Sequence, residues 1–247
     1  MPVALGRVYR ESFRRIDERV RSLAATNPAA LDTPVPACPG WTVHGVVSHV
    51  CGIAVDAVGG RLRGIPDDAW TAGQVDQRRG VPVAQVLDEW APHVDVVAGA
   101  LDARRMPVQM AADVLTHEGD VVEALGDPVP PADGWRDAAR LLGRSVVTHV
   151  DRPGTLTVRC GDDVWIGGAG EGPAASVDVE PWEFFRGVFS RRSVGQMRSW
   201  AWDGDPQPWL APLCVFGVRD DDQPRSVPPT STCDTNWLLT GSIHAWT

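Results

Sequence analysis

The chain has 247 residues, of which 43% are hydrophobic and 22% are charged. These fractions are ordinary for a folded globular protein and exclude a largely disordered chain, while the length allows one large core or two modest ones. The formal net charge is -9, all 23 basic residues are Arg, and no Arg-rich stripe is interleaved with aromatics. This balance excludes nucleic acid as an expected partner.

The chain also lacks the signals of a membrane or secreted protein. No apolar run approaches the roughly 20 residues that span a bilayer, and the N-terminal segment has no signal-peptide core. We therefore expect no membrane contact and a cytoplasmic location. The five cysteines are scattered and include no CxxC pair, which favours reduced thiols over a disulfide framework.

Four segments of the N-terminal half have apolar residues at helical spacing. The first covers about residues 4–26, and the second covers about 42–63 and opens on a Thr that suits the N-cap. The third begins near 81–82, where Pro suits the first turn of a helix. The fourth covers about 107–125 and ends at Gly126. Four helices of this length predict a bundle.

The pattern changes after the Pro/Asp/Gly-rich segment 127–134. We expect a connecting helix over 135–150, strands over 154–159, 164–166 and 175–179, and helical spacing again over 182–189 and 194–202. The predicted fold class is therefore α+β: a four-helix bundle over 1–131 and a small mixed domain over 132–222. Residues 223–247 form a tail whose apolar stretch, 236–239, is left unassigned.

The residues most suggestive of chemistry are Asp113 and His117, which are four apart on the fourth predicted helix, and His49 on the second. Side chains at i and i+4 share one helical face, and His49 can reach them from a facing helix. Two imidazoles and one carboxylate form a usual ligand set for a catalytic Zn²⁺ or a related divalent ion. The alternative from spacing alone is a core histidine beside an ordinary Asp/His pair on the helix surface.

Four segments resemble the mycothiol-dependent maleylpyruvate isomerase family. Residues 38–52 (CPGWTVHGVVSHVCG) are similar to the segment that carries a His ligand in that family. Residues 113–126 (DVLTHEGDVVEALG) resemble its acid-xxx-His helix, although the archetypal isomerase has Glu where this chain has Asp113. In the C-terminal half, 191–193 with Gln196 and 202–205 resemble segments of its sterol-carrier-like domain.

The resemblance implies a DinB-like metal-binding bundle, with His49, Asp113 and His117 as the ligands, followed by a sterol-carrier-like domain. It also implies mycothiol, the small thiol of actinobacteria, as cofactor or cosubstrate. The partners are then a low-molecular-weight thiol and a small electrophile, and the chain is expected to be a monomer or a small homo-oligomer.

Other residues near the proposed ligands each have two possible interpretations. Arg191, Arg192 and Arg198 are candidates for contacting an acidic substrate or mycothiol, because guanidinium groups suit carboxylates; the alternative is solvated helix arginines. Asp120 is placed to orient the His117 ring, or is a solvated helix residue. Trp41 either lines the pocket or packs between helices. We assign no nucleophile to Cys38 or Cys51, since buried cysteines are usually apolar packing residues.

These features predict a metal-dependent, mycothiol-using isomerase or transferase. A thiolate that adds to a cis-enoyl acid, allows rotation and leaves again would be an isomerase, whereas one that stays attached would be a transferase. Two other classes remain open: a non-catalytic metal or small-ligand binding module, and a metal-dependent hydrolase in which water takes the place of the thiol.

Overall fold

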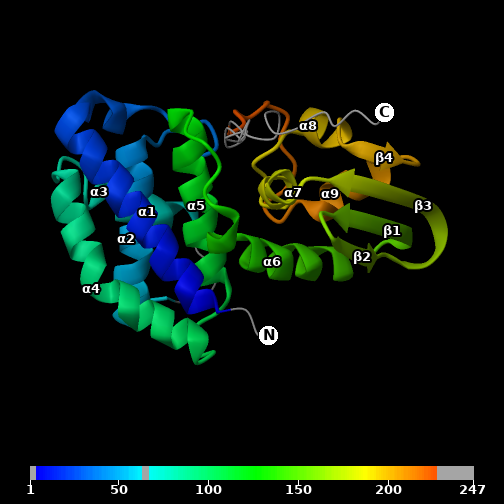
Figure 1. Cartoon of the computed structure of the whole chain (residues 1–247), viewed down its shortest axis with the longest axis horizontal. Helices are drawn as coiled ribbons and strands as arrows, with labels where there is room; N and C mark the ends of the chain where they lie inside the picture. The colour runs from blue at the N-terminus through cyan, green and yellow to red at the C-terminus, as the bar shows by residue number, and fades with distance from the viewer. Residues whose placement is uncertain (1–3, 63–66, 227–247) are drawn as a thin grey trace, which may run out of the picture.

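The computed structural model describes residues 4–62 and 67–226. Figure 1 shows a helical half and a half built around a β-sheet, with α6 (Arg136–Thr148) running between them. The predicted order, a helical bundle followed by a small α+β region, is therefore confirmed. Within the described residues, no helix has the length and hydropathy that crossing a membrane requires.

The bundle consists of α1 (Leu5–Thr26), α2 (Val43–Val58), α4 (Val83–Asp102) and α5 (Gln109–Leu125). Each helix turns an apolar face inward, and the side chains that fill the centre are large and almost fully buried. Trp90 of α4 is completely buried and its indole N–H donates to the Tyr9 hydroxyl of α1 at 3.1 Å. The pairing satisfies two polar groups inside an otherwise apolar core.

The ends of α2 and α5 follow local backbone chemistry. Thr42 caps α2 by accepting a hydrogen bond from the Gly45 N–H at 3.2 Å. The prediction that this helix reaches residue 63 is wrong: it ends at Val58, and Gly60 then turns the chain with a φ of 67°. Gly126 ends α5 with a φ of 68°, as the sequence predicted.

The second half contains a four-stranded mixed sheet in the order β2-β1-β3-β4. Its strands are β1 (Pro153–Cys160), β2 (Asp163–Gly167), β3 (Ala169–Val179) and β4 (Ala201–Asp203). β1 pairs antiparallel with β2 and parallel with β3, and β4 pairs antiparallel with β3. The accompanying helices are α7 (Pro181–Val188), α8 (Val194–Arg198) and α9 (Gln207–Leu213).

The core of this half continues into the bundle. Alternate residues of the strands, such as Leu156, Val158 and Val177, turn one face of the sheet toward buried aromatics of α7 and α9. The same cluster includes Ala112 and Leu115 of α5. Helix α5 is thus packed on both sides, with the bundle on one and the α+β half on the other.

Several other features differ from the sequence-based expectations. The helix α3 (Asp68–Asp76) and α9 were not predicted, and two short 3-10 turns occupy Pro28–Asp32 and Ala132–Gly134. A helix was predicted over 194–202, but α8 ends at Arg198. Residues Ala201–Asp203 instead form a strand, in which Trp202 pairs with Val177. The unassigned apolar stretch 236–239 lies outside the described residues.

Candidate metal centre

Helices α2 and α5 bring His49, Asp113 and His117 to one point of the bundle. Asp113 Oδ1 lies 3.7 Å from His49 Nε2 and 3.6 Å from His117 Nε2. The two imidazole rings meet edge to face with their centroids 4.9 Å apart. One donor atom from each residue lies within 4.8 Å of the others, close enough for all three to bind one cation.

The second ring nitrogen of each histidine already has a partner. His117 Nδ1 lies 2.9 Å from Asp120 Oδ2, so this N–H donates to the carboxylate. His49 Nδ1 lies 2.9 Å from Oε1 of Gln74 on α3. Both Nε2 atoms therefore keep a free lone pair toward Asp113, which is the arrangement that metal-binding histidines require. The donor set fits a divalent cation.

The three side chains differ in their access to solvent. The histidines are buried, with side-chain exposures of 4% for His49 and 9% for His117, whereas Asp113 is 30% exposed. The Trp41 ring covers the histidines, with its centroid 4.9 Å from that of His49 and 6.3 Å from that of His117. A small molecule would reach the cluster from the side of Asp113.

Asp120 is a fully buried carboxylate and not a solvated helix residue. Besides His117, it pairs with Arg186 of α7 at 2.6 Å and with Arg191 through two bonds of 3.0 and 3.1 Å. Burial raises the pKa of Asp120, but Arg191, Arg186 and His117 together hold it well below its usual value. Asp120 is thus an ionised acceptor that fixes the orientation of the His117 ring.

Cys38, His117 and Asp120 form a second group with atoms close enough to hold a cation. Two observations favour the first group instead. Two arginines already neutralise Asp120, and a dication beside them would be repelled. Burial also raises the pKa of the Cys38 thiol well above its usual value, and its S–H donates to Asp120 Oδ2 at 3.3 Å. Cys38 is therefore a protonated thiol that donates a hydrogen bond to Asp120, and we do not expect it to bind a metal.

The segment before α2 places Cys38 and Trp41. The Val35 N–H bonds to the Trp41 carbonyl at 2.9 Å, and the Cys38 N–H bonds to the Val35 carbonyl, also at 2.9 Å. Gly40 supports the turn with a φ of 82°. Arg219 from the C-terminal half donates to the Ala37 carbonyl at 3.2 Å, so both halves of the molecule hold this segment.

The three arginines predicted to contact a cofactor or substrate lie in different surroundings. Arg191 is close to the cluster through Asp120, and its guanidinium group lies over the Phe216 ring at 5.8 Å. Arg192 is fully buried and paired with Glu123 at 2.7 Å and Glu183 at 2.6 Å. Arg198 lies at the end of α8 and donates to Gln207.

Sequence reasoning missed two residues that shape the site. Arg186 was not singled out, although a lone cation on the apolar helix at 182–189 signals a buried acidic partner. Gln74 gave no such signal, because its segment has no clear apolar periodicity. Glu118, adjacent to the ligand His117, points away from the cluster and pairs with Arg15 of α1 at 2.9 Å, as the helical geometry predicts.

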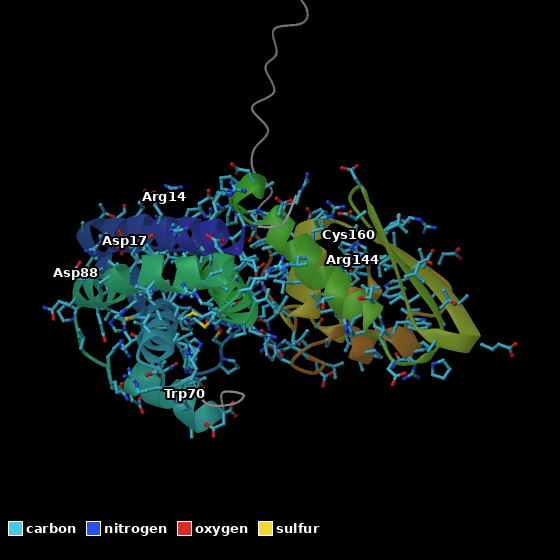
Figure 2. The ribbon with its side chains drawn as sticks, turned by 90° about the horizontal axis from the view of Figure 1, so that it is seen from below. Arg14, Asp17, Trp70, Asp88, Arg144 and Cys160 are labelled. Atoms are coloured by element: carbon cyan, nitrogen blue, oxygen red, sulfur yellow. The ribbon has the colours of Figure 1, made fainter. Side chains whose placement is uncertain are left out.

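Two cavities are lined mainly by residues of the C-terminal half, and the second is also lined by Ala4 and Arg7. One of about 180 Å³ is lined by residues of α6 and the β1–β2 turn, including Arg136, Cys160 and Trp165. A neighbouring, larger hollow includes Arg144 and Ile166. Figure 2 shows Cys160 and Arg144 in the C-terminal half, away from the bundle residues Asp17 and Asp88. Neither cavity includes a residue of the histidine cluster.

Comparisons with known proteins agree with this architecture. Residues 10–112 match the family model described as the mycothiol maleylpyruvate isomerase N-terminal domain. The matched range contains His49 and ends directly before Asp113. No curated protein sequence matches the chain significantly.

Two solved structures resemble this chain. They are crystal structures of the mycothiol-dependent maleylpyruvate isomerase and of a mutant of it in which a histidine is replaced by alanine. Each is 14% identical, with a TM-score of 0.50, and the likeness covers 76% of this chain and 88% of that chain. At this identity the likeness shows that the fold is shared.

Proposed function

We propose that the chain, whose residues 10–112 match the model of the mycothiol maleylpyruvate isomerase N-terminal domain, is a metal-dependent enzyme that uses a small thiol. Its substrate is a small electrophile, its thiol is mycothiol, and its reaction is that of an isomerase or an S-transferase. The observation that carries the proposal is the convergence of His49 Nε2, His117 Nε2 and Asp113 Oδ1, with both Nδ1 atoms occupied elsewhere.

The proposed centre suits thiol chemistry. A free thiol with a pKa near 8.5 is mostly protonated at neutral pH, and a divalent cation held by the three ligands would favour the thiolate. Asp113 contributes a negative charge: burial raises its pKa, but the neighbouring histidines and Arg191 lower it below its usual value. Asp113 is the one partly exposed member of the cluster, so we expect the thiol and the substrate to approach from its side.

Among the predicted arginines, the geometry favours Arg191 for contact with an acidic substrate or thiol. Arg191 is 11% exposed and adjoins the exposed ring of Phe216, whereas Arg192 is enclosed by carboxylates. Asp120 holds the guanidinium group through two bonds, so its position is fixed before a ligand arrives. A carboxylate of the substrate would find a positive charge beside the cluster.

The proposed reaction balances without an external oxidant or reductant. The thiolate sulfur adds to the electron-poor double bond of a cis-enoyl acid, and the electron pair moves onto the conjugated carbonyl oxygen. The former double bond can then rotate. When the electron pair returns, the carbon–sulfur bond breaks and the trans acid leaves. In a transferase, the adduct instead takes up a proton and is released with sulfur attached.

The first test is the metal content of the purified protein. We expect about one divalent ion per chain. His49→Ala and His117→Ala should lose it while retaining the helical circular dichroism signal. His149→Ala, which replaces an exposed histidine of the other half, should keep the ion. A wild-type protein that stays metal-free after reconstitution with Zn²⁺ or Co²⁺ would refute the ligand assignment.

The second test is thiol dependence. Incubation with maleylpyruvate should convert it only when mycothiol is present, and His117→Ala should reduce the rate by about 100-fold or more. Turnover of ester or amide substrates without any thiol would instead identify a hydrolase. Metal binding with no turnover of either kind would identify a binding module.

A further inference from the structure

The helix α3 buries one side chain, and that side chain is polar. Of its nine residues Asp68–Asp76, only Gln74 is buried, and the others are half-buried or exposed. Trp70 marks this helix at the outer edge of the bundle in Figure 2. A surface helix normally packs through an apolar stripe, so burial of a lone amide needs another explanation.

Both ends of the Gln74 amide are engaged. Its Nε2 donates to Asp56 Oδ2 at 2.7 Å, and its Oε1 faces His49 Nδ1 at 2.9 Å. Because Asp56 only accepts hydrogen bonds, the amide nitrogen must point to Asp56 and the oxygen to His49. The His49 Nδ1 atom must then carry the proton. The Asp56–Gln74 pair thus dictates the tautomer in which His49 Nε2 is free.

Neighbouring residues hold Asp56 and Gln74 in place. Arg61 donates to Asp56 Oδ1 at 2.7 Å, which holds the carboxylate in its orientation toward Gln74. Arg78 donates to the Gln74 carbonyl at 3.0 Å and is itself paired with Glu89 of α4 at 2.7 Å. Gly52 lets α3 approach α2, since a Cβ at that position would lie 2.6 Å from the Gln74 Cβ.

We propose that Gln74 is a positioning residue for the metal centre, which fixes the His49 ring and its Nδ1–H tautomer through Asp56. The proposal rests on the proposed function, because it assigns His49 as a ligand. Gln74 touches neither the metal nor the substrate, and it acts by presenting the His49 lone pair toward Asp113 and His117. Removing such an outer partner typically weakens metal binding by about 10- to 100-fold.

The test compares Co²⁺ binding by the full-length wild type and Gln74→Leu. Chelator competition gives the affinity, and the visible absorption of bound Co²⁺ reports the ligand geometry. We expect Gln74→Leu to bind Co²⁺ about 10- to 100-fold more weakly, with altered absorption bands. Gln77→Leu is the matched control, because it replaces an exposed glutamine three residues further along and should match the wild type.

A milder variant addresses the folding of Gln74→Leu. Asp56→Asn keeps the side-chain volume, but the new amide can donate hydrogen bonds as well as accept them. The amide of Gln74 is then free to rotate by about 180° and exchange its oxygen and nitrogen. We expect affinity to fall by up to about tenfold. In metal-free protein, the ¹⁵N shifts of the His49 ring should show a protonated Nδ1 in the wild type and a mixture of tautomers in Asp56→Asn.

The outcomes separate this inference from the proposed function. If the wild type binds no Co²⁺, both fail. If the wild type binds Co²⁺ and His49→Ala does not, the result supports the metal centre. In that case, an unchanged Co²⁺ affinity and spectrum in folded Gln74→Leu would overturn the role of Gln74 alone. Should Gln74→Leu not fold, unchanged binding and ¹⁵N shifts in Asp56→Asn would overturn it. A protonated Nε2 in the metal-free wild type would also contradict it.

Discussion

Burial controls the reactivity of the cysteines. Cys38, Cys51, Cys160 and Cys214 are all buried and unpaired within the described part of the chain. Burial raises the pKa of Cys51 and Cys160 to about 12 and that of Cys214 to about 11. The thiolate is the form that attacks alkylating reagents, and at pH 8 only about one in ten thousand groups with such a pKa of 12 is ionised. The folded protein should therefore resist alkylation.

Thiol labelling tests this expectation. Cys233 lies outside the described residues, so the experiment uses Cys233→Ser. Iodoacetamide at pH 8 should leave the four remaining thiols of the native protein largely unmodified over minutes, and modify all four in guanidinium chloride. Mass spectrometry counts the added groups. The folded-state pKa values are raised, so labelling should increase as the pH rises toward about 11 to 12. Rapid native labelling of Cys51, Cys160 or Cys214 at pH 8 would contradict the burial of these thiols.

At the residue scale, the candidate ligands and the contact of Asp120 with His117 were predictable, and the contribution of Gln74 was not. The i, i+4 spacing of Asp113 and His117 places both on one face, His49 lies on a helix that can face them, and the resemblance of residues 38–52 supported all three. Gln74 belongs to a helix without an apolar stripe, so no periodicity marks it. Its role depends on the approach of α3 to α2 at Gly52, which is a tertiary contact. The assignment of all three ligands stays a prediction until metal content is measured.

Two glycines offer a test at the scale of single helices. Gly126 ends α5 with a φ of 68°, and a Cβ added there would meet nothing within 4 Å. Gly126→Ala should therefore destabilise the protein by about 1 kcal/mol through backbone strain alone. Gly99, inside α4, is also free of contacts within 4 Å, but its backbone is helical. Gly99→Ala should stabilise the protein by about 0.5–1 kcal/mol.

Urea unfolding of metal-free protein measures both free energies. The same chemical change is thus expected to act in opposite directions at the two positions, because only the backbone conformation differs. A stabilising effect of Gly126→Ala would show that α5 does not end in the left-handed turn. A destabilising effect of Gly99→Ala would show that α4 is interrupted or more tightly packed there.

At the scale of elements, local signals predicted most boundaries. Gly126 and Thr42 act through their own backbone and side chain, so α5 ends and α2 begins where the sequence indicates. The strand Ala201–Asp203 was predicted as helix because apolar residues with helical spacing precede it. Its conformation is set by pairing with Val177 and its neighbours on β3, which are more than 20 residues away in sequence. Such long-range pairing leaves little local trace.

Across the whole molecule, a buried network of charges joins the two halves. Asp120 and Glu123 of α5 face Arg186, Arg191 and Arg192 from the C-terminal half, and Glu183 completes the network. The hydrophobic cluster around the sheet likewise includes residues of α5. The division at residues 131 and 132 stays a prediction, since α5 contributes to the packing of both halves.

Arg186 is the central cation of this network. It is completely buried and contacts Asp120 at 2.6 Å, Glu123 at 2.7 Å and the Thr116 carbonyl at 2.8 Å. Burial opposes its charge, yet Glu123 and Asp120 raise its pKa. Arg186→Met would leave two buried carboxylates short of a partner, and we expect a loss of about 3–5 kcal/mol in the free energy of unfolding. Arg198→Met, at an exposed position, should cost less than about 0.5 kcal/mol.

A double-mutant cycle separates the charge from the packing of the Arg186 side chain. Glu123→Gln removes one of the carboxylates that Arg186→Met leaves uncompensated, so the double variant should lose less than the sum of the two single losses. Residues in one ion-pair network typically show coupling of about 0.5–3 kcal/mol. Urea unfolding in the presence of chelator avoids any contribution from a bound metal. If Arg186→Met cost no more than Arg198→Met, α5 and α7 would be joined by apolar packing alone, and Asp120 would orient His117 without help from this arginine.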